Sequence, residues 1–427
     1  MPRLSTQPYK GTRDFYPEEM RLRRWMFGRL RETVERHGYE EYDGPMLEPF
    51  ELYAAKTGEE IVNSQLYAFE DRGGRKVAIR PEMTPTLARM VAGKFHELPR
   101  PVRWFSTPNL WRYERPQRGR LREHWQLNVD VLGGDPVLAD AEVLGLAFEL
   151  IDGFGGGERI AIRVNHRRLV DHFFREELKL PEGAALKATK AVDAREKVGE
   201  ERYQAWLLEI GLDPDQARRM DEFFQSPFEA TARRMPCEGV ELLRGLFAAL
   251  EGSPARERIV FDPTVMRGLD YYTGTVFEIF DTSPENRRAM FGGGRYDNLL
   301  RLFGNESLSG VGFGMGDVTL QNFLETHRLV PALPAATDVF VALPSAGLRK
   351  AADAVARELR KAGLRTVTSL TPGAFGTQLK QAQRLQARFT VLLGERELAE
   401  GMYLLKNMAT GEQSAHGLGQ LAPAIRA

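Results

Sequence analysis

Residues 111–131 read WRYERPQRGRLREHWQLNVDV, and two runs of alternating polar and apolar residues flank an arginine-rich loop. Alternation with period 2 predicts the two strands of a hairpin, because successive side chains of a strand point to opposite faces. One predicted face is apolar and suits a core: Trp111, Tyr113, Trp125, Leu127, Val129 and Val131. The other predicted face is polar: Arg112, Glu114, Gln126, Asn128 and Asp130.

The loop between these runs carries Arg115, Arg118, Arg120 and Arg122. A guanidinium group matches phosphate oxygens bidentately and stays charged, so arginines in such numbers suit a phosphorylated ligand. A solvated hairpin face is the simpler explanation for a single Arg–Glu pair. A whole strand face of polar residues in strict register favours a binding site instead.

The length of 427 residues exceeds one ordinary core, so two or three domains are expected. The formal net charge is zero, and a polyanionic partner would therefore have to be held by local patches. Cys237 is the only cysteine, which excludes an internal disulfide and a cysteine-based zinc cluster. No run approaches the ~20 apolar residues of a membrane span, and no apolar signal core begins the chain. We expect a cytoplasmic protein with no membrane contact.

Periodicity divides the rest of the chain into segments of different character. Helices are predicted at about 17–37 and 137–151, and strands at 39–47, 77–80, 258–261 and 274–280. The stretch 170–255 is rich in Arg, Glu, Ala and Leu, and we interpret it as a helical insertion. Residues 331–337 form a plausible linker.

The pattern of the sequence changes after residue 337. It predicts strands at 339–343, 366–369 and 389–393 that alternate with helices at 346–362 and 374–386. Such alternation indicates a small parallel or mixed sheet. Residues 338–427 contain 12 Lys or Arg and 7 Asp or Glu, a net charge of +5. From charge alone, a polyanion-binding module and a solvated basic surface are about equally supported.

Residues 80–85, Arg-Pro-Glu-Met-Thr-Pro, end a predicted strand and begin a predicted helix. Thr84 is a typical N-cap and Pro85 a typical first helical residue, so helix capping explains both without any function. Glu82 lies in the turn, where its carboxylate could accept a hydrogen bond from an ammonium group. Local sequence alone favours capping.

Three further stretches are less easily explained by structure. Residues 267–278 read RGLDYYTGTVFE and lead into a strand, and residues 291–297, FGGGRYD, predict a turn at 292–294 that lets backbone approach a ligand closely. Residues 310–316, GVGFGMG, alternate glycine with larger apolar residues, a pattern typical of a strand that packs closely against a neighbour. The seven histidines show no metal-ligand spacing, so no metal site is predicted in the protein.

Taken together, these segments resemble a histidyl-tRNA synthetase, a class II aminoacyl-tRNA synthetase, over nearly the whole chain. The resemblance begins at residues 9–17, YKGTRDFYP, and passes through a first class II motif that ends near Pro49. Residues 111–131 match the second motif, 310–316 the third, and 267–278 and 291–297 the two stretches peculiar to the histidyl family. The tail resembles the anticodon-binding domain at residues 394–398 and 406–411, GEREL and KNMATG.

The resemblance implies an α+β fold, in which an antiparallel sheet flanked by helices forms the catalytic domain from residues 1–169 and 256–330. It also implies a helical insertion at 170–255, an α/β anticodon-binding domain at 338–427, and a homodimer. The activity implied is the ATP-dependent attachment of histidine to its tRNA through a histidyl-adenylate intermediate, with Mg²⁺ on the ATP.

Carried over residue by residue, the resemblance assigns Arg267 and Arg112 to catalysis: Arg267 would lie between the histidine carboxylate and the α-phosphate, and Arg112 would bind the α-phosphate. Asp130 and Tyr272 would bind the imidazole nitrogens. The remaining histidine-binding positions are Glu82, Thr84, Gln126 and Tyr271. The ATP-binding positions are Arg112, Glu114, Arg120 and His124.

The chain departs from the family pattern around the adenine. Synthetases with the third motif usually follow its glycines with Glu-Arg, and the arginine stacks on adenine; here Thr319 takes the arginine's position. The aromatic residue expected on the other adenine face is His124, and Asp130 replaces a longer glutamate. The resemblance therefore leaves open how adenine is held.

Two other functions fit parts of the pattern. The regulatory subunit of ATP phosphoribosyltransferase resembles this catalytic domain and senses histidine without charging tRNA, but it typically lacks the anticodon-binding domain and an intact arginine–tyrosine stretch. A class II synthetase for another amino acid would need Asp130 and Tyr272 to serve a different side chain. The stretches peculiar to the histidyl family argue against both.

Overall fold

The computed structural model describes residues 4–55, 61–266, 271–286 and 288–426. The chain divides into two compact units, Met1–Pro331 and Ala332–Ala427, and each is described by itself. Among the described residues, no helix is long and apolar enough to cross a bilayer.

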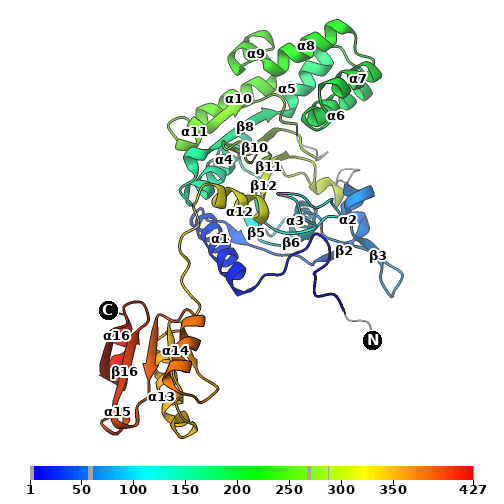
Figure 1. The fold of residues 1–427 in the computed structure, drawn as a ribbon. Coiled ribbons are helices and arrows are strands. Elements are labelled where there is room, and N and C mark those ends of the chain that lie inside the picture. The colour runs from blue at the N-terminus through cyan, green and yellow to red at the C-terminus, as the bar shows by residue number, and fades with distance from the viewer. Residues whose placement is uncertain (1–3, 56–60, 267–270, 287, 427) are drawn as a thin grey trace. The chain divides into compact units, whose positions relative to one another are not determined.

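A nine-stranded sheet forms the centre of the first unit (Figure 1), with the strand order β1-β5-β7-β12-β11-β10-β8-β9 and with β6 paired to β7. Neighbours are antiparallel except β1 with β5 and β8 with β9, which are parallel. The strands are β1 (Glu40–Glu41), β5 (Val102–Ser106), β6 (Asn109–Trp111), β7 (Glu123–Leu132), β8 (Ile160–His166), β9 (Ile259–Phe261), β10 (Thr275–Asp281), β11 (Ala289–Tyr296) and β12 (Gly310–Gly316). The predicted α+β class, an antiparallel sheet with flanking helices, is confirmed.

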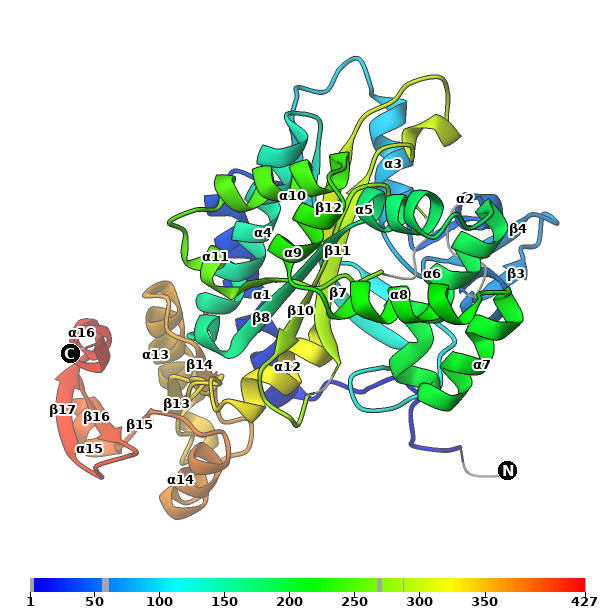
Figure 2. The same ribbon diagram turned by 90° about the horizontal axis from the view of Figure 1, so that it is seen from above.

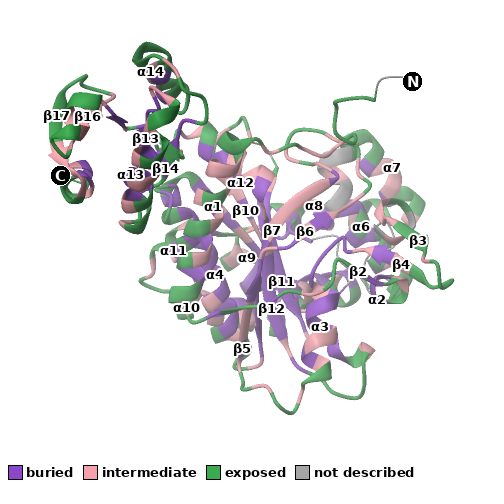
Figure 3. Ribbon diagram, turned by 90° about the horizontal axis from the view of Figure 1, so that it is seen from below, coloured by how far each residue is buried: buried purple, intermediate pink, exposed green. Residues whose placement is uncertain are grey.

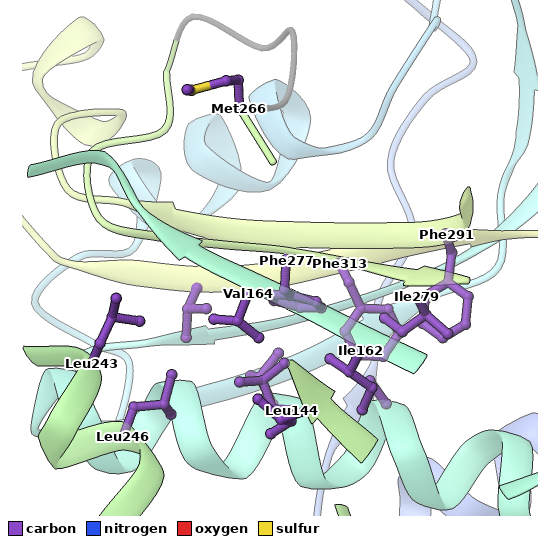
Figure 4. Packing of buried hydrophobic residues seen from close by; sticks show 14 of the residues in the cluster. Leu144, Ile162, Val164, Leu243, Leu246, Met266, Phe277, Ile279, Phe291 and Phe313 are labelled. Atoms are coloured by element: carbon purple, nitrogen blue, oxygen red, sulfur yellow. The ribbon is translucent and has the colours of Figure 1, made fainter. Parts of the chain in front are cut away.

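The helices α1 (Pro17–Arg36) and α4 (Pro136–Asp152) lie side by side along the sheet (Figure 2). The sequence predicts both, and the Asp135 carboxylate caps α4 by accepting from the backbone N–H groups of Val137 and Leu138, at 3.0 Å each. Burial is concentrated on the central strands (Figure 3). In Figure 4, Leu144 of α4 packs beneath Phe277, Ile162 and Val164 of the sheet.

Further elements complete the first unit. A small sheet pairs β2 (Leu47–Pro49) and β3 (Ala68–Glu70) with β4 (Lys76–Ile79), beside α2 (Phe50–Ala54) and α3 (Thr84–Gly93), and α12 (Asp317–Thr326) follows β12. The stretch after β8 is helical, as its composition indicates. Its helices are α5 (Arg167–His172), α6 (Glu182–Val198), α7 (Glu200–Ile210), α8 (Pro214–Gln225), α9 (Phe228–Arg234), α10 (Glu238–Ala249) and α11 (Pro254–Arg258).

The second unit is a mixed five-stranded sheet in the order β14-β13-β15-β16-β17, as the alternating pattern predicts. β13 pairs in parallel with β14 and β15, and the last two strands are antiparallel. The elements are β13 (Val339–Val341), α13 (Arg349–Lys361), β14 (Thr366–Thr368), α14 (Phe375–Arg384), β15 (Phe389–Leu392), α15 (Glu395–Ala399), β16 (Met402–Asn407), β17 (Gln413–Gly417) and α16 (Leu421–Arg426).

The predicted hairpin is confirmed in its second strand but not in its first. The first strand, β6, ends at Trp111, and Tyr113 is 50% exposed rather than part of a core. Arg112 N–H donates to Arg122 O at 2.8 Å, but Tyr113 N–H donates to Gln65 O at 2.7 Å and Arg122 N–H to Gly11 O at 2.8 Å. The loop between these ends is therefore held both by its own pairing and by distant parts of the chain.

The predicted glycine turn at 292–294 is wrong, because these residues lie inside the buried strand β11. Close packing explains the glycines: a Cβ on Gly293 would lie 1.9 Å from the carbonyl oxygen of Gly312 on β12. The alternating glycines of β12 behave as predicted. A Cβ on Gly312 would lie 2.1 Å from Asp130 Oδ1, and one on Gly314 2.1 Å from Gln126 Nε2.

Gly293→Ala tests this packing. The new methyl group would push against backbone, which cannot give way as a flexible side chain can, so we expect the free energy of unfolding to fall by about 1–3 kcal/mol or more. Gly28→Ala is the matched control, because Gly28 lies within α1 with nothing inside 4 Å of an added Cβ, and it should stabilise by about 0.5–1 kcal/mol. Equal effects of the two changes in urea unfolding would contradict the close approach of β11 and β12.

Candidate active site

The predicted site residues that the structure describes converge on one face of the central sheet. Side chains on β7 alternate, so that Leu127 and Val129 enter the core while Gln126 and Asp130 point to the other face. The glycines of β12 lie beside that second face, because Gly312 pairs with Asp130. Two adjoining features lie there: a group of buried polar side chains around Asp130, named the polar pocket, and a cleft.

Asp130 lies at the bottom of the polar pocket and is 3% exposed. Its Oδ1 accepts a hydrogen bond of 2.6 Å from the Tyr296 hydroxyl of β11. Burial raises the pKa of Asp130 to about 7, and the hydrogen bond from Tyr296 only partly offsets this. Burial also raises the pKa of Tyr296 well above its ordinary value, so Tyr296 remains a neutral donor. The carboxyl group can thus change protonation near neutral pH.

Three tyrosines border this pocket. The Tyr271 hydroxyl donates to Glu82 Oε2 at 3.0 Å, and the Tyr271 ring lies 4.9 Å from the ring of Tyr272 and 6.0 Å from that of Tyr296. The stretches at 271–278 and 291–297, far apart in the sequence, therefore meet at Asp130 and Glu82.

Helix capping does not explain the 80–85 turn. The N-cap of α3 is Met83, and no side-chain capping hydrogen bond is made at this end of the helix. The capping interpretation of Thr84 is wrong because the helix begins at Thr84, which places this residue inside the first turn. Glu82 faces the pocket through its hydrogen bond with the Tyr271 hydroxyl.

Two residues that support the pocket were not predicted from the sequence. Tyr296 belongs to the stretch 291–297, which the sequence predicts to supply a turn. A strand through 291–296 would instead have placed Tyr296 next to β12. Arg80 anchors the 80–84 turn: its Nη1 donates to Asp43 Oδ1 and Gly44 O at 2.7 Å each, and its Nε to Asn109 O at 3.0 Å. No local pattern reveals Arg80, because its partners lie about 30 residues away on either side.

The cleft adjoins the pocket at Gln126, whose Nε2 donates to Asn128 Oδ1 at 2.7 Å. The second-motif loop, β7, β12 and the start of α12 form its walls. Its lining residues are Arg112, Glu114, Gly119, Arg120, Leu121, His124, Gln126, Met290, Gly314, Gly316, Val318 and Thr319.

The predicted ATP-binding side chains all line this cleft. Arg112 Nε donates to Pro81 O at 2.9 Å, which fixes this arginine between the cleft and the turn that carries Glu82. Arg120 Nη1 lies 3.3 Å from Glu114 Oε2, a buried oxygen for which the described residues supply no hydrogen bond of good geometry. A ligand donor could satisfy it.

His124 is a neutral imidazole in the cleft. Burial, with the nearby charges of Arg112 and Arg13, lowers its pKa to about 3. The ring can therefore stack on a flat ligand but cannot supply a positive charge. Thr319 cannot supply one either, and its hydroxyl donates to Met290 O at 2.6 Å.

The third motif is fixed by an ion pair that the sequence did not predict. Asp317 accepts from the backbone N–H of Trp125 at 3.1 Å and from Arg13 Nη2 at 2.7 Å. The hydrogen bond from Trp125 ties the first turn of α12 to β7, and the ion pair ties it to the N-terminal segment that carries Arg13. Arg267, the remaining predicted catalytic residue, lies outside the described residues.

Comparisons with known proteins agree over the whole chain. A family profile described as histidyl-tRNA synthetase matches residues 11–318, and one described as an anticodon-binding domain matches residues 338–427. A histidine–tRNA ligase of Leptospira biflexa is 47% identical over 416 residues, which are 96% of this chain and 95% of the relative. Another, of Haloarcula marismortui, is 41% identical and covers 95% and 94%.

Solved structures give the same picture. A histidyl-tRNA synthetase from Nostoc sp. PCC 7120 superimposes with a TM-score of 0.83 at 25% identity and covers 99% of both chains. A protein described as an ATP phosphoribosyltransferase regulatory subunit/histidyl-tRNA synthetase from Bacillus halodurans C gives 0.73 at 24% identity, covering 90% of this chain and 97% of its own. This second likeness shows the fold alone.

Asp130→Asn tests the electrostatics of the pocket. The folded protein holds a proton on Asp130 up to about pH 7, whereas the ordinary pKa is 3.8, so wild-type stability is lost as pH rises through this window. Asparagine does not titrate. We therefore expect the variant's stability relative to wild type to increase by about 1.4 kcal/mol per pH unit between roughly pH 5 and 7 in urea unfolding.

Tyr296→Phe is the companion variant. It removes the hydrogen bond that favours the ionised Asp130, so the pKa of Asp130 should rise further. The loss of stability with increasing pH should therefore extend to higher pH. A stability difference between Asp130→Asn and wild type that does not vary with pH would contradict a buried, titrating Asp130.

Proposed function

The chain belongs to the histidyl-tRNA synthetase family and attaches histidine to its tRNA with the use of ATP, and we propose that the pocket and cleft described above form the adenylating site. The observation that carries this proposal is that Arg112 and Gln126 join the two. A buried Asp–Tyr pocket suits an imidazole, an arginine-lined cleft suits a nucleotide, and the point where they meet is where carboxylate and phosphate must react.

In the pocket, Asp130 and Tyr272 bind the imidazole nitrogens, with Tyr296 orienting the Asp130 carboxyl group. Glu82, Thr84 and Gln126 hold the α-ammonium, while Tyr271 fixes Glu82. An analogue that lacks the ring nitrogens would leave these buried polar groups without partners, which penalises its binding.

In the cleft, Arg112 binds the α-phosphate, Arg120 the outer phosphates, and Glu114 Oε2 the amino group of adenine, with His124 stacked on one face of the base. The resemblance places Arg267 between the two reacting anions. Among the described residues, no group of three His, Cys, Asp or Glu side chains could hold a metal ion. We accordingly treat Mg²⁺ as part of the MgATP substrate.

The first step joins two anions. A carboxylate oxygen of histidine attacks the α-phosphorus, a P–O bond forms, and pyrophosphate leaves with the electrons of the bond that breaks. Arginines aimed at the α-phosphate reduce the repulsion and stabilise the charge that develops at phosphorus. In the second step the 3′-terminal hydroxyl of tRNA attacks the acyl carbon, and AMP leaves.

The C-terminal unit supplies the contact to tRNA. It matches an anticodon-binding domain and carries the basic excess, so its charge favours binding to the polyanion. The regulatory alternative is less supported, because relatives that are histidine–tRNA ligases match over nearly the full length of the chain.

We also propose a cytoplasmic homodimer. The register of β2, β3 and β4 puts Leu47, Phe69, Val77 and Ile79 on one face of the small sheet. Leu47 and Phe69 are 46% and 47% exposed, and apolar side chains gathered on an open sheet face suit a contact between subunits.

Removing either catalytic arginine tests the proposal. Arg112→Ala and Arg267→Ala should each lower the kcat of histidine-dependent ATP–pyrophosphate exchange by about 10²-fold or more, because the lost charge acts mainly on the transition state. Arg24→Ala, at an exposed position of α1, is the matched control and should exchange like wild type. Near-normal exchange by both variants, with unaltered unfolding curves, would overturn the assigned roles.

A further inference from the structure

The cleft is lined by one aromatic ring and by several uncharged side chains. His124 is a neutral ring, and Met290, Val318 and Thr319 are further lining residues that carry no charge. A purine base carries a π-face that attracts a planar guanidinium group, so a cation over the base would strengthen binding. The lining residues include two arginines, Arg112 and Arg120, and the proposed function engages both with phosphates.

Arg288 is close to two segments that line this cleft. Along the chain it is two residues from Met290, and its Nη2 donates to Gln117 Oε1 at 3.1 Å. Gln117 pairs with Arg120 through two backbone hydrogen bonds of 2.9 and 3.0 Å, and this tight turn carries Gly119, which lines the cleft. The Arg288 side chain thus connects the segment of Met290 with the loop that carries Gly119 and Arg120.

The segment before Arg288 is anchored on the body of the domain. Asn286 Nδ2 donates to Asp281 Oδ2 at 2.7 Å and to Thr326 Oγ1 at 3.2 Å. Asn286 Oδ1 in turn accepts from Arg118 Nη2 at 3.2 Å, so Arg118 connects the loop to this segment. Arg288 contrasts with it: it is exposed, and Gln117, a neutral residue, is its hydrogen-bond partner among the described side chains.

We propose that Arg288 folds over the adenine of bound ATP and supplies the cation that the third motif lacks at Thr319. This rests on the proposed function, because it takes the cleft as the ATP site. Bound ATP would lie between the His124 ring and the guanidinium group of Arg288. The loop contact to Gln117 then holds Arg288 ready beside the loop that carries Gly119 before the nucleotide enters.

The test is the KM for ATP and for histidine in histidine-dependent exchange, with equilibrium dialysis of labelled ATP as a second readout. Arg288→Ala should raise the KM for ATP and weaken ATP binding by about tenfold, the size of a desolvated cation–π contact. The KM for histidine should not change. Arg288→Lys should fall between wild type and Arg288→Ala, because it keeps the charge but loses the planar group.

Two further variants separate stacking from a mere closure of the loop. Gln117→Ala removes the positioning hydrogen bond but leaves the arginine, so it should weaken ATP binding clearly less than Arg288→Ala does. Thr319→Arg in the Arg288→Ala background should recover ATP binding, because it returns a guanidinium group to the lining of the cleft. Unchanged ATP binding in Arg288→Ala, or an equal loss in Gln117→Ala, would overturn the proposal.

Failure of the proposed function would look different. In that case wild-type protein would show no histidine-dependent exchange. Equilibrium dialysis would still test the role of Arg288 in that case. Weaker ATP binding by Arg288→Ala than by wild type would support the role, and equal ATP binding by the two proteins would refute it.

Discussion

The close approach of β12 to the side chains of β7 is the constraint on which the site depends. Glycines at 312 and 314 leave room for the Asp130 carboxyl group and the Gln126 amide to lie flat on the sheet, where any Cβ would fall 2.1 Å from a polar atom. A ligand pocket can therefore form on a sheet face that is otherwise fully packed. The same constraint holds at Gly310, where a Cβ would lie 2.6 Å from the ring of Tyr296, the residue that donates to Asp130.

Burial then sets the chemistry of the pocket. A carboxyl group without solvent is costly to ionise, and the hydrogen bond from Tyr296 offsets only part of that cost. An imidazole that donates to Asp130 would favour the carboxylate further, so binding of histidine and ionisation of Asp130 are coupled. The buried ion pair Arg295–Asp140, at 2.6 Å, connects β11 to α4 and thereby stabilises the strand that carries Tyr296. Pre-organisation of this kind keeps the polar groups oriented before a ligand arrives.

The sequence predicted well wherever a pattern is local. The helices α1 and α4, the alternation of β7 and the strands and helices of the tail all follow from periodicity and caps. It failed where the local pattern does not fix the exact boundary or the partner of a backbone group: α3 begins at Thr84 rather than after it, and the backbone N–H groups of Tyr113 and Arg122 donate to the distant residues Gln65 and Gly11. The glycines of β11 indicate a turn by composition, and only their neighbour across the sheet reveals a strand. The proposed site residues come from the family resemblance, whereas Arg80 and Arg288 have partners that no motif identifies.

The central claim is that the buried polar pocket and the arginine-lined cleft act together to adenylate histidine. Histidine-dependent ATP–pyrophosphate exchange on the purified protein tests it most directly, with the other amino acids as controls. The account predicts exchange with histidine alone, despite Thr319 and His124 around the adenine. Binding of histidine without any exchange would contradict it, and would show a protein that senses histidine but does not activate it.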